Sequence, residues 1–165
     1  MSAIRGEHCV LTAVQRPRQS FRLDAGRQFY LVCGGDTVLD LSDCMKHGRL
    51  RFILNNKSYA SYLQQEEYGL KRGNDVLQSP VARLKRGFHR YRYECQIGGA
   101  EYQLRARYFG RGCNLFRGRN RVGSICPEKS FGGDYSINLP PEMDLVTVAF
   151  LFWLTVEMVP HDSSE

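Results

Sequence analysis

The sequence predicts a mainly β protein, an antiparallel closed β-barrel wrapped around one apolar helix at the carboxy-terminal end. Two observations predict this fold. Ten of the twelve residues from 145 to 156 are apolar, so the helix that they form has no polar face. Between residues 20 and 137, short segments of alternating polarity are separated by glycine-rich turns, a spacing typical of β-sandwiches and barrels. A sheet with one apolar face can enclose a helix that is apolar on every side.

The helix is predicted over about residues 142–158, and its length argues against a membrane span. A span needs about 20 apolar residues, whereas runs of about 10–14 are more often buried core helices. Glu142 or Asp144 lies at the start of the helix, where the helix dipole favours an acidic side chain. We therefore expect a helix inside the domain, with Phe150 and Trp153 almost fully buried.

The strands are predicted from alternation and from the turn residues between them. Gly34-Gly35 and Gly98-Gly99 are suited to tight hairpin turns because glycine adopts positive φ without strain. Residues 59–68 are ambiguous between helix and strand. Further turns are predicted at residues 55–57 and 71–75. The predicted strands lie within residues 27–33, 37–41, 49–54, 58–65, 89–97, 100–109, 113–118, 121–126 and 134–140.

The hairpin around Gly98-Gly99 yields the one candidate site. With these glycines as the loop, apolar and aromatic side chains share one face, and arginines oppose one another on the other face. The expected pairs are Ile97–Ala100, Cys95–Tyr102, Tyr93–Leu104 and Tyr91–Ala106 on the apolar face, and Arg92–Arg105 and Arg90–Arg107 on the arginine face.

The candidate anion-binding residues are therefore Arg90, Arg92, Arg105 and Arg107. Like charges directly opposite across a ladder are unfavourable, and a bound anion would offset the repulsion, since guanidinium groups suit phosphate. The alternative is a solvated face whose arginines are screened, or paired with acids of a neighbouring strand. A register shift of one residue would turn the arginines inward. The patch could extend to Arg83, Lys85, Arg86, Arg111, Arg117, Arg119 and Arg121.

Composition indicates one domain, residues 1–165, with a net charge of +6 from 23 Lys and Arg against 17 Asp and Glu. This excess favours anionic partners such as lipid headgroups, nucleic acid or acidic proteins, although many basic proteins bind no polyanion. Tyrosine and arginine interleave in FHRYRYE and RARYFGRG, as in some nucleic-acid binders. Strand alternation turns those tyrosines inward, where they cannot stack on bases, so nucleic acid is disfavoured.

No motif of a catalytic or metal site is present. There is no P-loop, no G-x-S-x-G and no histidine pair at i, i+4. We therefore expect no catalytic residues, no metal and no cofactor. Residues 1–30 contain no recognisable export signal, so we expect a cytoplasmic protein. The even number of cysteines would allow three disulfides, but without an export signal we expect free thiols. The cysteines are Cys9, Cys33, Cys44, Cys95, Cys113 and Cys126.

The end of the chain resembles the tubby-like superfamily, which includes the tubby carboxy-terminal domain, phospholipid scramblases and LURP-one-related proteins. The resemblance rests on Val122-Gly123-Ser124-Ile125, then Tyr135-Ser136-Ile137-Asn138-Leu139-Pro140 with Asp144, followed directly by the apolar helix. Earlier, RFILNNKSYASYLQQEEYGL is similar to the strand pattern of LURP-one-type chains. The resemblance covers roughly residues 20–158. These motifs are packing patterns, and their order and position carry the resemblance.

The resemblance implies a barrel of roughly twelve strands around a central helix and a membrane-associated or regulatory role. Tubby itself binds phosphoinositide headgroups through basic residues on the barrel exterior, but no lipid-site motif of that family aligns here. The proline-rich, cysteine-rich and calcium-binding segments of scramblases are not found in the sequence, which argues against lipid scrambling. We expect a monomeric, non-enzymatic module that binds phosphoinositide or other phospholipid headgroups peripherally at a membrane. The alternative is a protein-interaction or regulatory barrel without a lipid ligand.

Overall fold

The computed structural model describes residues 11–15, 29–41, 49–86, 91–107, 112–128 and 133–158. Their strands form one antiparallel twelve-stranded sheet with the order β3-β2-β1-β12-β11-β10-β9-β8-β7-β6-β5-β4. The strands are β1 (Leu11–Gln15), β2 (Phe29–Cys33), β3 (Asp36–Leu41), β4 (Arg51–Leu54), β5 (Lys57–Gln64), β6 (Glu67–Arg72), β7 (Asp75–Arg86), β8 (Tyr91–Ile97), β9 (Ala100–Ala106), β10 (Cys113–Arg117), β11 (Asn120–Pro127) and β12 (Tyr135–Asn138).

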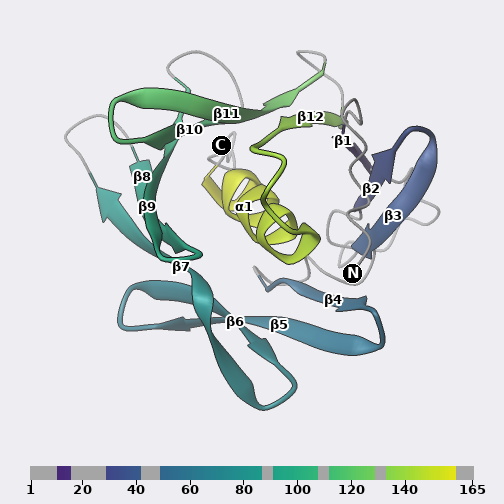
Figure 1. The fold of residues 1–165 in the computed structure, drawn as a ribbon, viewed down its shortest axis with the longest axis horizontal. Coiled ribbons are helices and arrows are strands. Elements are labelled where there is room, and N and C mark those ends of the chain that lie inside the picture. The colour runs from purple at the N-terminus through teal and green to yellow at the C-terminus, as the bar shows by residue number, and fades with distance from the viewer. Residues whose placement is uncertain are drawn as a thin grey trace, which may run out of the picture.

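The sheet curls around the single helix of the described chain, α1 (Leu145–Met158), which Figure 1 shows in the middle of the ring of strands. The two ends of the strand order, β3 and β4, come into contact and bring the barrel close to closure. The prediction of a mainly β barrel around a carboxy-terminal helix is therefore confirmed.

Two-residue hairpin turns set the alternation of the strands. Gly34-Gly35 and Gly98-Gly99 have positive φ, as predicted, and so do Asn55 and Asn56. The ambiguous residues 59–68 form parts of β5 and β6, joined through Gln65 and Glu66, which also have positive φ. Three strands fall outside the predicted segments: β1, β6 and β7.

The helix begins with a capping residue that the sequence indicated. The side-chain Oδ1 of Asp144 accepts a 2.8 Å hydrogen bond from the backbone N–H of Thr147, which satisfies a donor that the first turn leaves free. From Val148 to Leu154 every residue is buried. The buried hydroxyl of Thr155 donates to the carbonyl of Leu151 at 2.9 Å, so this polar side chain is satisfied within the helix. In the described part of the chain, no helix has the length and apolar character of a membrane span.

Aromatic rings of the helix pack against rings of the barrel in two directions. The Phe152 ring contacts those of Phe29 and Tyr135 edge-on, with centroid distances of 4.9 and 5.4 Å. In the second direction, the centroid of the Trp153 ring lies 5.9 Å from that of the Tyr68 ring. Phe150 and Trp153 are 0% and 2% exposed, which confirms their predicted burial.

The glycine of the VGSI segment has a packing role. In β11, Gly123 lies against β12, and a Cβ built on it would come within 2.6 Å of the Asn138 carbonyl oxygen. The neighbouring Val122 packs on the core. Glycine at this position therefore allows the last two strands to approach closely just before the chain enters the helix.

The prediction of six free thiols is wrong for Cys33, which is disulfide-bonded. The prediction rested on the missing export signal, which says nothing about the cysteines that folding brings together. Cys95, Cys113 and Cys126 are free, as predicted. The remaining two, Cys9 and Cys44, lie outside the described residues.

Candidate functional site

The β8–β9 hairpin has the register expected from its sequence. Its ladder pairs Ile97 with Ala100 and continues without a shift to Arg92 and Arg105. The inward side chains of this hairpin are buried, while Arg92 is exposed and Arg105 is half-buried. The inward set is Tyr93, Cys95, Ile97, Tyr102 and Leu104. The two arginines therefore lie on the outer face of the barrel.

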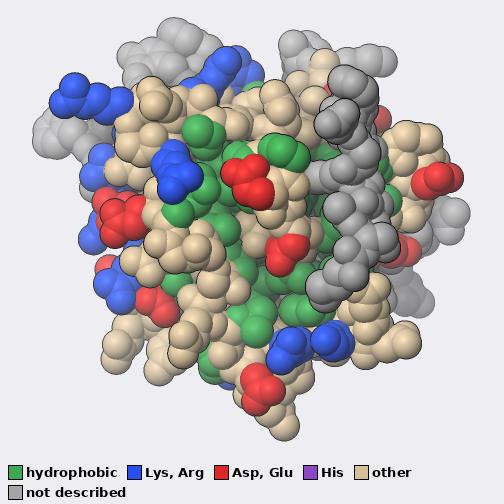
Figure 2. Space-filling view, viewed as in Figure 1, with side chains coloured by type: hydrophobic (Ala, Val, Ile, Leu, Met, Phe, Trp, Pro, Cys, Tyr) green, Lys and Arg blue, Asp and Glu red, His purple; other side chains and the backbone are tan. Residues whose placement is uncertain are grey.

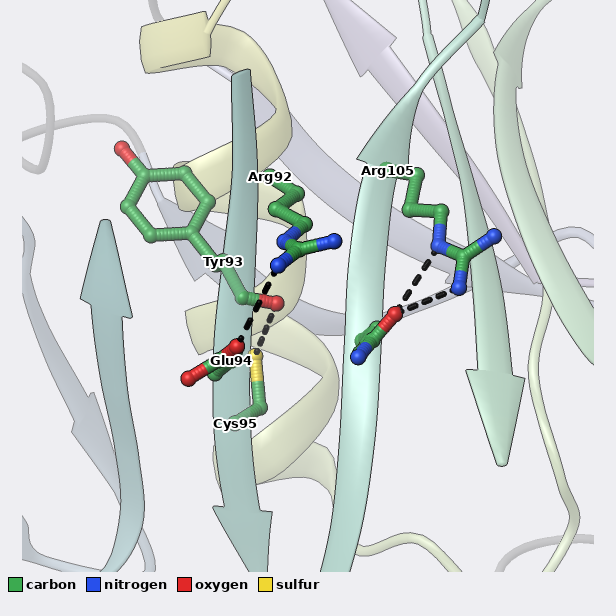
Figure 3. Close-up of polar contacts among 6 residues, drawn as sticks. Arg92, Tyr93, Glu94, Cys95 and Arg105 are labelled. Carbon is green, nitrogen blue, oxygen red and sulfur yellow. Dashed lines mark hydrogen bonds and ion pairs between the residues drawn. The ribbon is translucent and has the colours of Figure 1, made fainter. Parts of the chain in front are cut away.

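Three basic side chains follow one another across the outer face. Lys85 of β7 pairs with Arg92 of β8, and Arg92 pairs in turn with Arg105 of β9. Figure 3 shows Arg92 and Arg105 on neighbouring strands, on the side of the sheet away from the helix. We call Lys85, Arg92 and Arg105 the basic row. Residues directly opposite have Cβ atoms about 5 Å apart, so each cation has a like charge as its neighbour.

Arg105 is held in place by two neighbours. Its Nε donates to Oε1 of Gln103 at 3.0 Å, and its Nη2 donates to the same oxygen. The guanidinium lies over the Phe116 ring, 4.4 Å from the centroid, a cation–π arrangement. Neither contact neutralises the charge. Arg105 is thus a positioned cation, half-buried on the outer face of the barrel.

Arg92 is held less firmly. Its Nη2 lies 3.7 Å from Oε1 of Glu94, and both side chains are more than two-fifths exposed. Ion pairs of this length and exposure contribute at most about 1 kcal/mol. Arg92 can therefore leave Glu94 for a stronger anionic partner at little cost.

Of the other two candidate arginines, the structure describes only Arg107, and its side chain lies outside this row. Arg107 follows the end of β9, and its Nη1 lies 3.1 Å from the sulfur of Cys126 on β11. Between them lies Gly112, whose carbonyl accepts from the Arg107 N–H at 3.1 Å. Arg90 lies outside the described residues, so the predicted Arg90–Arg107 pair stays a prediction.

The basic residues to which the patch was expected to extend lie in two environments. Arg83 on β7 is bound to Glu67 of β6 by Nε and Nη2 at 3.1 and 3.0 Å. Arg117, Arg119 and Arg121 are exposed at the β10–β11 hairpin. Arg111 and the side chain of Arg86 lie outside the described part of the chain.

A groove of about 450 Å³ lies beside the basic row on the outer face of β6, β7, β8 and β9. Two of its lining residues, Glu94 and Gln103, are the partners of Arg92 and Arg105. Figure 2 shows cationic and anionic side chains interspersed on this side of the molecule. The polar side chains that line the groove are Glu67, Arg83, Glu94, Gln96, Glu101 and Gln103.

Sequence reasoning missed the groove and the pairing of Lys85 with Arg92. Both depend on β7, which lies outside the predicted strand segments. The alternation of Val81, Arg83 and Lys85 on the outside with Ala82 and Leu84 on the inside was the available signal.

Among the described residues, no three histidine, cysteine or carboxylate side chains gather as a metal site would require. Two of the free thiols, Cys95 and Cys113, face the barrel interior, and burial raises the pKa of each to about 12. A thiol with so high a pKa is a poor nucleophile near neutral pH.

Comparison of the chain with protein-family models, with curated proteins and with solved structures finds no match. The candidate function must therefore be argued from the residues of the site.

Proposed function

We propose that this protein is a non-catalytic binding module that binds the phosphate of an anionic headgroup at a membrane surface through the basic row. The observation that carries the proposal is the register that puts Arg92 between Lys85 and Arg105. Three cations in direct succession repel one another. An anion that bridges the three cations offsets this repulsion, so the electrostatic energy of the row favours anion binding.

The two arginines suit phosphate in different ways. Arg105 is held by Gln103 and Phe116, so little side-chain entropy is lost when it binds. Arg92 has only the long contact with Glu94 to give up. Guanidinium groups form paired, charge-assisted hydrogen bonds to phosphate oxygens. A phosphate between these side chains would be bound by one rigid and one mobile donor group.

The sequence resemblance to the tubby-like superfamily supports the same proposal. In that superfamily a barrel encloses its last helix, and tubby binds headgroups through exterior basic residues. We therefore also propose that this chain is a member of the superfamily. Fold analogy by itself does not establish a ligand, so the proposal depends on the basic row.

A protein-interaction barrel is the second candidate, and one observation favours it. Large apolar side chains are exposed on three different strands: Ile53 is 69% exposed, Leu63 60% and Val76 55%. Such side chains are available to contact a protein partner. Such a partner would contact β4 to β7 and leave the basic row free.

Pelleting with phosphatidylglycerol/phosphatidylcholine vesicles at low salt tests the headgroup proposal. We expect the parent to pellet, and the double variant Arg92→Gln, Arg105→Gln to bind at least about tenfold more weakly, because each charge-assisted bond to phosphate is worth about 1.5–3 kcal/mol. Adding Arg90→Gln and Arg107→Gln measures whether the other two predicted residues contribute.

The matched control is Arg51→Gln, Arg72→Gln, which removes two exposed charges from β4 and β6. It should retain most of the binding, and both double variants should unfold within a few degrees of the parent. Equal binding by the parent and the Arg92, Arg105 variant would refute the site. A parent that never pellets would favour the protein-interaction candidate instead.

A further inference from the structure

The groove is continuous with the basic row, and the connection is made by specific contacts. Arg92 contacts Glu94 at 3.7 Å, and Arg105 donates to Gln103 at 3.0 Å. Glu94 and Gln103 pair across the β8–β9 ladder and both line the groove. A phosphate held by the two arginines would therefore lie at the rim of the groove, and the rest of its molecule would lie over these residues.

The groove carries the opposite charge to the row. Glu67, Glu94 and Glu101 contribute three carboxylates from three strands, and only Glu67 is firmly neutralised, by Arg83 at 3.0 Å. Glu101 is exposed and makes no ion pair within the described chain. A ligand with several phosphates would bring a second negative charge against Glu94 or Glu101, which is unfavourable at short range.

The ion pair between Arg92 and Glu94 indicates which charged groups a ligand would need. If Arg92 turns to a phosphate, the Glu94 carboxylate loses its cation and needs another. An ammonium group a few bonds from the phosphate supplies it, and Glu101 lies along the same groove. The amide side chains of Gln96 and Gln103 add uncharged hydrogen-bonding groups. With such a ligand every charged group has an opposite charge beside it.

We propose that the groove and the basic row together recognise a phosphate ester that carries a primary amine, with the phosphate on Arg92 and Arg105 and the ammonium on Glu94 and Glu101. Ethanolamine phosphate headgroups share this chemistry with free aminoalkyl phosphates. A serine phosphate headgroup has the same two groups, and in this arrangement its additional carboxylate faces solvent, away from Glu94 and Glu101. The groove volume of about 450 Å³ lies within the range of small-molecule sites. This inference rests on the proposed phosphate-binding function and adds selectivity to it.

Two kinds of vesicle with equal surface charge test the selectivity. Phosphatidylserine and phosphatidylglycerol each carry one net negative charge, but only phosphatidylserine has an amine. At equal mole fraction in phosphatidylcholine we expect the parent to bind phosphatidylserine vesicles at least about tenfold more tightly, since the amine adds charge-assisted hydrogen bonds. Equal binding to the two vesicles would overturn the inference and leave the proposed function standing.

The double variant Glu94→Gln, Glu101→Gln gives the more specific result. It should lose the preference for phosphatidylserine and keep, or strengthen, its binding to phosphatidylglycerol, because the change frees Arg92. The control Glu128→Gln makes the same kind of change at an exposed position outside the groove and should preserve the preference. A preference that survives the Glu94, Glu101 variant would also overturn the inference.

Soluble probes distinguish a lipid from a free ligand. Aminoethyl phosphate should displace the protein from phosphatidylserine vesicles, and ethyl phosphate should do so at least about tenfold less well. Displacement shows that the headgroup alone is recognised, whereas a vesicle preference without displacement shows that the membrane surface is required as well. If the parent binds neither vesicle, both this inference and the proposed function are wrong.

Discussion

The two buried thiols, Cys95 and Cys113, make the stability of the barrel depend on pH. Each side chain is 1% exposed, and burial raises the pKa of each thiol from 9.0 to about 12. In the unfolded chain both thiols ionise at their ordinary pKa, so the folded state binds more protons between these values. Their contribution to stability is complete below about pH 9 and is lost as the pH rises toward about 12.

We therefore expect the free energy of unfolding to fall as the pH rises above about 9, by up to about 1.4 kcal/mol per pH unit for each buried thiol. Denaturant unfolding across an alkaline pH series measures this slope. The variant Cys95→Ala, Cys113→Ala should have a shallower slope than the parent, and Cys126→Ala, at a half-buried outer position, serves as the control. A slope unaffected by the double variant would show that the thiols do not carry it.

At the scale of an element, the side chain of Asp144 stabilises the helix that follows it. Its side chain caps the first turn of α1 through Thr147. Asp144→Ala should lower the free energy of unfolding by about 1 kcal/mol, the usual cost of losing such a cap. Glu142→Ala removes an exposed acid near the same helix end, and a change within about 0.5 kcal/mol is expected for it. Thermal or denaturant unfolding compares the two; equal losses would mean that the helix dipole, rather than the cap, is responsible.

The β11–β12 pair depends on one glycine. Since a Cβ on Gly123 would come within 2.6 Å of a backbone oxygen, the strands would have to separate to accommodate it. We expect Gly123→Ala to cost about 1–3 kcal/mol, as overpacking does, in spite of the usual gain from replacing glycine in a strand. Ser124→Ala on the outer side of the same strand is the control and should be nearly neutral. Chemical denaturation measures both variants.

The whole molecule folds around a helix that comes last in the described chain. Trp153 is the only tryptophan of the sequence. It is 2% exposed, and its side chain projects from the helix toward the barrel wall. Its Nε1 has no hydrogen-bond partner among the described residues, so within this part of the chain the indole stabilises the fold through packing. Its fluorescence should therefore resist quenching by acrylamide until the barrel itself unfolds, and the change should coincide with loss of the β-sheet circular dichroism signal.

Truncation of the helix core tests the same dependence. Phe150→Ala and Trp153→Ala should each cost about 3–5 kcal/mol because no neighbouring element can fill the space left inside the barrel. Leu63→Ala removes a 60% exposed side chain and should be nearly neutral. A Trp153 that is readily quenched in the folded protein would contradict the buried helix.

The sequence by itself determined the helix, the mainly β class and the register of the β8–β9 hairpin. The helix was predictable because a run without a polar face must be enclosed. The register was predictable because Gly98 and Gly99 adopt the positive φ of a two-residue turn, after which alternation assigns every side chain to a face. Local chemistry was sufficient in each case. The turn at Gln65-Glu66 was not predictable, since neither residue favours the positive φ that the β5–β6 pairing requires.

Only the tertiary structure decided which charges meet. The position of Lys85 beside Arg92 follows from the β7–β8 pairing, across a connection whose length and turn residues do not specify a register. The contact of Arg105 with Phe116 joins neighbouring strands of two different hairpins, and Arg107 reaches Cys126 across the side-chain-free Gly112. The groove depends on residues from four strands, β6 to β9, at once. Alternation assigns a residue to a face, but its lateral neighbours depend on strand order and register, which are set by packing around the whole barrel.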